Sequence, residues 1–249
     1  MGLPKIVVPE YSLTLPSNGK EVKYRPFLVK EEKILLIAME SEDEQQIVDA
    51  TKTVIKNCVF GDFEVEEMPI FDVEYVFLWL RSKSKGEIIE LKYDCPKCEN
   101  KIPLSFNTEE IKITNDDTHN NKIELTENLG VVLRYPNMTL QAKLESMDTN
   151  EVEKIFTTVV ECIDYIYDNE NTYPNKDHTR KEMSEFVDSL TDSQFQKLTH
   201  FFETMPKLRH EVVLRCKNKN KQGKKKDKKT VECGYTEDLV LEGLQSFFV

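Results

Sequence analysis

Four of the six cysteines in the chain stand in two segments of the same design. Cys95 and Cys98 are separated by two residues, and Cys216 and Cys233 by sixteen, with apolar segments flanking each pair. Zinc prefers four soft ligands in a tetrahedron, and two cysteine turns that face each other supply four thiolates. Gly234, directly after the last of these cysteines, can adopt the positive φ that such turns need. The sequence therefore predicts one structural zinc ion per chain, held by Cys95, Cys98, Cys216 and Cys233, with no open coordination position.

Two other interpretations of these cysteines stay open. The first is the remnant of a metal site that has lost its zinc, because a spacing of sixteen residues departs from the short turns of most zinc ribbons. The second is a thiol redox motif at Cys95-Pro-Lys-Cys98, although such motifs stand at the start of a helix. Here the alternating segment Ile102–Phe106 follows and predicts a returning strand, which favours metal binding over redox chemistry.

The segments around the cysteines predict an α+β fold. Residues 1–86 open with a hairpin and continue with three helical patterns, so we expect one N-terminal α+β unit. Residues 87–114 and 207–249 carry the two cysteine-bearing β-hairpins of a split zinc-ribbon-like unit. Residues 115–206, between these halves, predict a hairpin followed by a helical insertion that includes one helix over 150–167.

The charge is distributed unevenly along the chain. The net charge is −11, yet the segment between Cys216 and Cys233 holds eight lysines and only two acidic residues. The rest of the chain is correspondingly more acidic, which argues against a general nucleic-acid-binding protein, because phosphate neutralisation needs a basic surface. Residues Lys217–Lys229 include no apolar side chain, so we expect a disordered, solvated loop. A contact of this loop with phosphates is the alternative.

The sequence lacks the signals of membrane insertion, secretion and catalysis. No apolar run reaches the ~18–20 residues of a membrane-spanning helix. Residues 1–9 lack the basic and apolar regions of a secretory signal, so we expect the protein to stay in a reducing cytoplasm. The chain has no Gly-x-Gly-x-x-Gly, no Walker loop and no Gly-x-Ser-x-Gly. We therefore expect neither enzymatic activity nor a small-molecule substrate.

Five segments carry a family resemblance that extends over most of the chain: Tyr24–Met39, Phe71–Glu87, the turn Cys95–Cys98, Phe201–Lys207 and Leu241–Phe248. Together they resemble the baseplate hub assembly proteins of T4-like contractile-tailed bacteriophages. The resemblance implies a late viral protein that helps to build the central hub of the tail baseplate by binding other phage hub proteins. It leaves open whether the protein is an assembly chaperone, acting in the host cytoplasm, or a minor component that stays in the virion baseplate. A zinc-ribbon accessory factor that binds nucleic acid is the alternative from a different class.

We expect the contacts to such partners at two places. They are Arg25 and Phe27 in the edge-like segment of the N-terminal hairpin, and Trp79, Arg81, Lys83 and Ser84 at the end of the third helix. A purely structural role is the alternative, with Trp79 in the core and the cations on a solvated helix end. We expect the apolar tail Leu244–Val249 to pack on the ribbon, and its exposure to a partner is the alternative.

Overall fold

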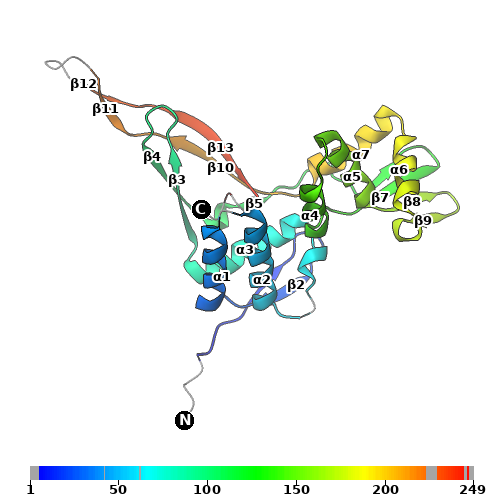
Figure 1. Ribbon diagram of the computed structural model, residues 1–249, viewed down its shortest axis with the longest axis horizontal. Helices are drawn as coiled ribbons and strands as arrows, with labels where there is room; N and C mark the ends of the chain where they lie inside the picture. Colours follow the sequence, from blue (N-terminus) through cyan, green and yellow to red (C-terminus); the bar gives the residue numbers. More distant parts are fainter. Residues whose placement is uncertain (1–5, 42, 62, 223–228, 244–245, 247–249) are drawn as a thin grey trace, which may run out of the picture.

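The computed structural model describes residues 6–41, 43–61, 63–222, 229–243 and 246. These residues form a mixed α+β fold with seven α-helices and several small sheets, so the predicted α+β class is confirmed. Figure 1 shows an elongated arrangement, in which the N-terminal helices lie between a second helical part at one end and a long β-ribbon at the other. Within the described residues, no helix has both the length and the apolar character required to cross a bilayer.

The N-terminal part consists of a hairpin and three α-helices. Its elements are β1 (Tyr11–Thr14), β2 (Glu21–Tyr24), α1 (Val29–Glu40), α2 (Glu44–Cys58), a 3-10 turn (Val65–Glu67) and α3 (Ile70–Lys85). The two strands pair antiparallel, and the inward side chains Leu13 and Val22 share a core with Val76 and Leu80 of α3. Gly86 follows α3 with a φ of 106°, a conformation that glycine adopts without strain, and the helix ends there.

The part between residues 115 and 206 has a second core. Its elements are β6 (Lys122–Glu124), β7 (Leu129–Leu133), α4 (Met138–Ser146), α5 (Glu151–Cys162), β8 (Ile163–Asp168), β9 (Thr172–Pro174), a 3-10 turn (Asn175–Asp177), α6 (Arg180–Asp188) and α7 (Asp192–Thr204). The strands form one antiparallel sheet in the order β6-β7-β8-β9. Helices α5, α6 and α7 pack on this sheet through Val160, Val187 and Phe201, which share a core with Val131 of β7.

The predicted helix over residues 150–167 is wrong beyond Cys162. There the chain leaves α5 and enters β8, which pairs with β7. The register of β7 and β8 shifts between Val132 and Leu133, and both Ile163 and Ile166 are buried. Two buried residues at a spacing of three are also the pattern of a helix face, and the sequence alone did not separate the two arrangements.

The β-ribbon is built from two distant parts of the chain. Its elements are β3 (Ile88–Asp94), β4 (Lys101–Asn107), a 3-10 turn (Thr108–Glu110), β5 (Lys112–Ile113), β10 (Leu208–Arg215), β11 (Lys219–Gln222), β12 (Lys229–Glu232) and β13 (Thr236–Glu242). Strands β3 and β4 form one hairpin, whereas β10 lies between β13 and β5. The two pieces meet α3 in a shared core of Leu78, Ile89, Phe106, Leu208 and Leu241. The predicted division of the chain into units stays a prediction, because shared packing does not show which parts fold alone.

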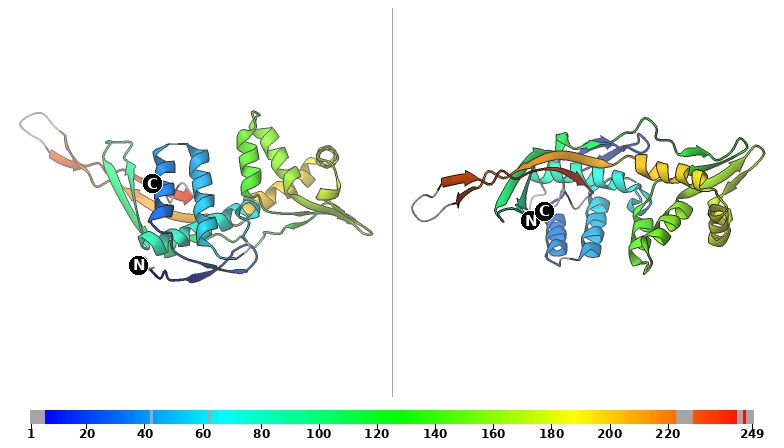
Figure 2. Two further views of the ribbon diagram at one scale, coloured as in Figure 1. Left: turned by 60° about the horizontal axis from the view of Figure 1, so that its bottom comes forward. Right: turned by 90° about the horizontal axis from the view of Figure 1, so that it is seen from above.

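The lysine-rich segment is more ordered than predicted. Strands β11 and β12 pair antiparallel from Lys219↔Glu232 to Gln222↔Lys229, which contradicts the expected loop, while residues 223–228 lie outside the described residues. The pairing has a local cause, because the N–H of Cys233 donates to the carbonyl of Asn218 at 2.8 Å and starts the two arms side by side. Both views in Figure 2 show this lysine-rich hairpin, β11 and β12, extending the line of β10 and β13 away from the helices. The tail Leu244–Val249, which we expect to pack on the ribbon, lies almost wholly outside the described residues.

Candidate metal centre

The first cysteine turn lies between β3 and β4. The carbonyl of Cys95 accepts hydrogen bonds from the N–H groups of Cys98, at 3.3 Å, and Glu99, at 2.8 Å. The N–H of Cys95 donates to the carbonyl of Asn100 at 2.9 Å, so the strands of the hairpin continue directly into the turn. Glu99 has a φ of 58°, which is uncommon outside glycine and lets the chain reverse right after the second cysteine.

The second cysteine turn repeats this design at the end of β10 and the start of β13. The N–H of Cys216 donates to the carbonyl of Tyr235 at 2.9 Å, which holds the two strands together at the turn. Gly234 has a φ of 64°, as the sequence predicts, and it occupies the same place after its cysteine as Glu99 does in the first turn. The two turns are therefore built alike, although only the second uses glycine.

The structure brings all four predicted ligands together. The ligand atoms of Cys95, Cys98, Cys216 and Cys233 all lie within 4.8 Å of one another. The Sγ atoms of Cys95 and Cys233 are 3.7 Å apart, and those of Cys98 and Cys216 are 3.6 Å apart. Four sulfurs at about 2.3 Å from a tetrahedral zinc ion lie about 3.8 Å from one another, so the two short separations are close to those expected around zinc.

The surroundings of the cluster suit a metal that is shielded from solvent. Cys95, Cys216 and Cys233 are buried and Cys98 is half-buried, and Ile102 and Leu214 pack around them. Several thiolates at this separation repel one another in a buried site, and a divalent cation removes that repulsion. With four sulfur ligands, no coordination position is left for water or substrate, so the site would serve the fold and not catalysis.

Two polar side chains beside the cluster were not predicted. The Nδ2 of Asn218 donates to the Sγ of Cys98 at 3.6 Å, and this bond is the largest cause that lowers the pKa of the Cys98 thiol to about 6. The Nζ of Lys97 donates to the carbonyl of Cys233 at 2.7 Å and so connects the first turn to the second. Both residues lie within two positions of a cysteine, but such groups carry no sequence pattern of their own.

The other two cysteines behave differently. Cys58 lies in the core beneath the N-terminal hairpin, and Cys162 is buried at the end of α5. Burial is the largest cause that raises the pKa of their thiols, to about 11 for Cys58 and about 12 for Cys162. Both thiols therefore stay protonated at neutral pH, as expected for small buried apolar residues.

Among the predicted partner contacts, three residues hold the start of α1 to its neighbours. The guanidinium of Arg25 pairs with Glu31 at 2.9 Å and donates to the carbonyl of Asn57. Phe27 is buried, and its N–H donates to the Oγ of Ser84 on α3 at 2.9 Å. These contacts are internal, so Arg25, Phe27 and Ser84 have clear structural roles.

The remaining three predicted contacts lie nearby on α3. The Nζ of Lys83 pairs with Glu87 at 2.8 Å and lies 5.8 Å from the ring centroid of Trp79. Trp79 is half-buried against the N-terminal core, and its Nε1 is buried without a hydrogen-bond partner in the described part of the chain. The Nη1 of Arg81 is likewise buried without a hydrogen-bond partner among the described residues. The six predicted residues therefore gather around one region, and Trp79 and Arg81 differ from the others in having a buried donor atom left unpaired.

Comparison with known proteins gives results over nearly the whole chain. The model of the family described as "T4 bacteriophage base plate protein" matches residues 8–249. The chain is similar to "Baseplate hub assembly protein gp26" of Enterobacteria phage T4, with 23% identity over 240 residues that cover 96% of this chain and 98% of that protein. No solved structure shows a significant match. The chain therefore belongs to the T4 bacteriophage base plate protein family.

Proposed function

We propose that this protein is a non-enzymatic assembly factor for the central hub of a bacteriophage tail baseplate, and that it acts by binding other hub proteins. The observation that carries the proposal is the family match over residues 8–249, together with the printed name of the T4 relative. Assembly by binding requires that hub subunits are held in a binding-competent state, and each tenfold gain in that population corresponds to about 1.4 kcal/mol.

The shape of the protein is suited to such a role. The helical part around β6–β9, the N-terminal helices and the β-ribbon each present a separate surface along an elongated molecule (Figure 1). Exposed apolar side chains occur on more than one of these parts, including Leu36 on α1 and Val152 on α5. Separate surfaces of this kind allow one protein to hold more than one subunit.

We further propose that one zinc ion, bound by Cys95, Cys98, Cys216 and Cys233, joins the two halves of the β-ribbon. The support is the convergence of the four sulfur atoms within 4.8 Å of one another, two separations close to those around zinc, and the burial of three of the four cysteines. Such an ion would contribute folding free energy, because the complete ligand set exists only in the folded chain.

The function is tested by co-expressing the protein with each of the other hub proteins of its phage and separating the products by size exclusion. Co-elution with at least one hub protein is expected, and its absence for all of them would contradict the proposal. Mass spectrometry of purified phage particles then separates two roles. A chaperone that leaves is missing from particles, whereas a minor component of the virion is present in them.

A nucleic-acid-binding accessory factor is the second candidate, and the lysine-rich hairpin is the observation in its favour. Phosphate contacts by lysines give affinity that falls steeply with salt concentration. A gel shift with mixed DNA and RNA at low and high salt distinguishes the candidates. Salt-sensitive binding supports the second candidate, and no binding at low salt removes it.

A further inference from the structure

Arg81 is a half-buried charged side chain with one buried nitrogen that lacks a partner in the described part of the chain. It lies in the C-terminal half of α3, and the nitrogen in question is Nη1. Burial lowers the pKa of this guanidinium. Arginine nevertheless stays protonated in proteins, so a buried N–H of this charged group without an acceptor destabilises the isolated fold. A group that destabilises the fold in this way is expected where it serves binding.

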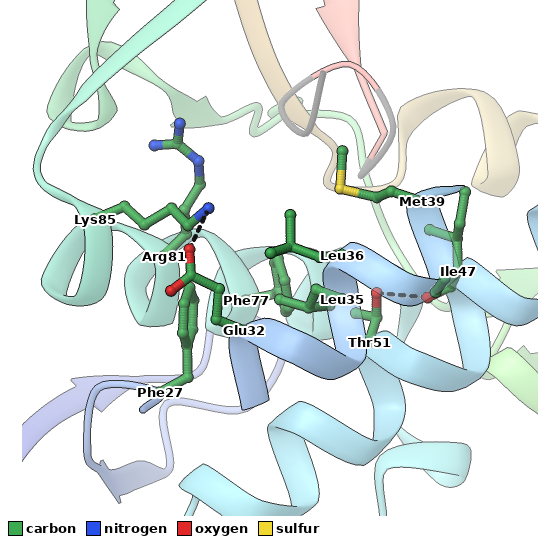
Figure 3. A pocket seen from close by; sticks show the side chains of 11 residues that line it. Phe27, Glu32, Leu35, Leu36, Met39, Ile47, Thr51, Phe77, Arg81 and Lys85 are labelled. Atoms are coloured by element: carbon green, nitrogen blue, oxygen red, sulfur yellow. Dashed lines mark hydrogen bonds and ion pairs between the residues drawn. The ribbon is translucent and has the colours of Figure 1, made fainter. Parts of the chain in front are cut away.

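A groove between α1 and α3 opens beside Arg81, with a volume of about 190 Å³. Phe77 is buried in it, whereas Leu36 and Met39 are 52% and 43% exposed. Leu36 and Met39 stand three residues apart on α1, so they form one apolar edge of the groove. Figure 3 shows these side chains of α1 across from Arg81 and Lys85 of α3. The groove thus combines an accessible apolar wall with a guanidinium that forms no ion pair with the described residues.

The charges around the groove favour a partner that carries a carboxylate. The Nζ of Lys85 pairs with Glu32 at 2.9 Å, so the acidic residue at the rim already has a partner. An apolar segment alone would bury Arg81 further and leave its Nη1 unpaired. An apolar segment with one acidic residue would cover Leu36 and Met39 and give Arg81 a charge-assisted hydrogen bond.

We propose that the groove between α1 and α3 binds an apolar segment of another baseplate hub protein, and that an Asp or Glu of this segment pairs with Arg81. This inference rests on the proposed function and names the surface that performs it. A second copy of this chain and the chain's own residues 247–249 are the other occupants, and the experiment below distinguishes them.

The test uses the full chain, co-expressed with the hub protein that co-elutes with it. Arg81→Met keeps the length and apolar stem of the side chain but removes the charge, and Leu36→Asp places a charge on the apolar wall. Both variants are expected to bind the hub protein at least about tenfold more weakly, because each leaves a buried carboxylate or an apolar contact unmatched. Lys181→Met, at an exposed lysine of α6, and Ile37→Asp, at an exposed residue of α1 that does not line the groove, are the controls, since they remove a positive charge and introduce a negative charge elsewhere. Both controls are expected to bind like the wild type.

Thermal unfolding of the same variants separates binding from folding. Arg81→Met is expected to unfold at the same or a higher temperature than the wild type, because it removes a charged group with a buried donor that lacks an acceptor. A lower unfolding temperature would show that Arg81 has a structural partner and would overturn the proposal. Equal binding by wild type, Arg81→Met and Leu36→Asp would also overturn it but would leave the proposed function intact. Failure of the wild type to bind any hub protein would overturn both.

Two further measurements identify the occupant. Light scattering of the chain alone shows a concentration-dependent dimer, lost in Arg81→Met, if a second copy fills the groove. Deletion of residues 247–249 lowers the unfolding temperature of the wild type more than that of Leu36→Asp if the chain's own tail fills it. Either result contradicts a hub segment as occupant. A single Asp→Lys or Glu→Lys change in the hub protein that restores binding to Arg81→Glu would support it.

Discussion

The Sγ atoms of Cys98 and Cys216 lie 3.6 Å apart, although 118 positions separate the two residues in the chain. The other short separation, between Cys95 and Cys233, also joins the β3–β4 turn to the β10–β13 turn. Each close pair therefore takes one sulfur from each turn. Because each turn supplies only two of the four cysteines, the loss of one cysteine is expected to affect both halves of the ribbon.

Metal content is the first prediction. The purified protein is expected to contain about one zinc per chain by elemental analysis, and Cys95→Ser to contain none. The variant should be destabilised by more than ~3 kcal/mol, since structural zinc contributes about 10–16 kcal/mol of apparent binding free energy in zinc-finger peptides. Cys58→Ala, at a buried cysteine outside the cluster, should keep its zinc. Zinc-free wild-type protein that is fully folded would contradict the prediction.

The hydrogen bond from Asn218 to Cys98 gives the second prediction. Asn218→Ala removes this donor, so the pKa of the Cys98 thiol should rise from about 6 towards the usual value of a cysteine. Metal affinity should fall by roughly 10–100-fold, as for other groups that contact a metal ligand. Competition with a chelator measures the metal affinity. The pH dependence of alkylation of the metal-free protein measures the pKa of the Cys98 thiol. Asn115→Ala, at an exposed asparagine between β5 and β6, is the matched control and should leave the metal affinity and the pKa of the Cys98 thiol unchanged.

Asp72 gives a prediction about pH. Its carboxylate accepts hydrogen bonds from the N–H of Ser17, at 3.0 Å, and from the Ser17 hydroxyl, yet burial is the larger effect and raises its pKa. A raised pKa in the folded state means that the protonated form is favoured there. The contribution of Asp72 to stability is therefore fully present below the unfolded pKa, near 3.9, and is lost as pH rises through the folded value.

Asp72→Asn tests the direction of this pH dependence, because the amide does not titrate. The unfolding free energy of the wild type, minus that of the variant, should fall as pH rises from about 4 and then become constant. Denaturant unfolding at several pH values measures the difference. A difference that rises with pH would show that the hydrogen bonds from Ser17 outweigh burial.

Gly130 gives a prediction about packing. It lies on β7 directly opposite Tyr167 of β8, and a Cβ atom at residue 130 would collide with the Tyr167 ring. Gly130→Ala should therefore destabilise the protein by about 1–3 kcal/mol, as overpacking does in other cores. The same change should have a smaller effect in a Tyr167→Ala background, which removes the ring. An equal effect in both backgrounds would mean that the loss of stability comes from the conformational preference of glycine and not from the collision with the Tyr167 ring.

Much of this fold follows from local patterns. The Cys95–Cys98 turn between two alternating segments predicts a metal-binding turn. Both signals, the cysteine spacing and the flanking strands, lie within a few residues of one another in the sequence. The long second turn is found from Cys216 and Cys233 only by its similarity to the first. The positive φ of Gly234 follows from its residue type, whereas that of Glu99 does not, because the surrounding hydrogen bonds override its preference.

Other features depend on contacts that one sequence does not reveal. The change from α5 to β8 at Ile163 is decided by pairing with β7, so a helical spacing of apolar residues gives the wrong answer there. The strands β11 and β12 form because the cysteine turn holds their ends together, although their composition indicates a solvated loop. The burial of Arg81 Nη1 without a hydrogen-bond partner among the described residues is likewise a property of the packed helices and has no sequence signal.

The positions of the four cysteines in the chain also determine when, during synthesis, the metal site can form. A ribosome that has added Cys95 must add 138 further residues before Cys233 exists. Until then the first turn can offer only two thiolates, and the ribbon that packs on α3 lacks its β13 strand. A chain that terminates before Cys233 cannot complete the four-cysteine set. The cluster therefore distinguishes chains that extend to Cys233 from shorter products before any partner is bound.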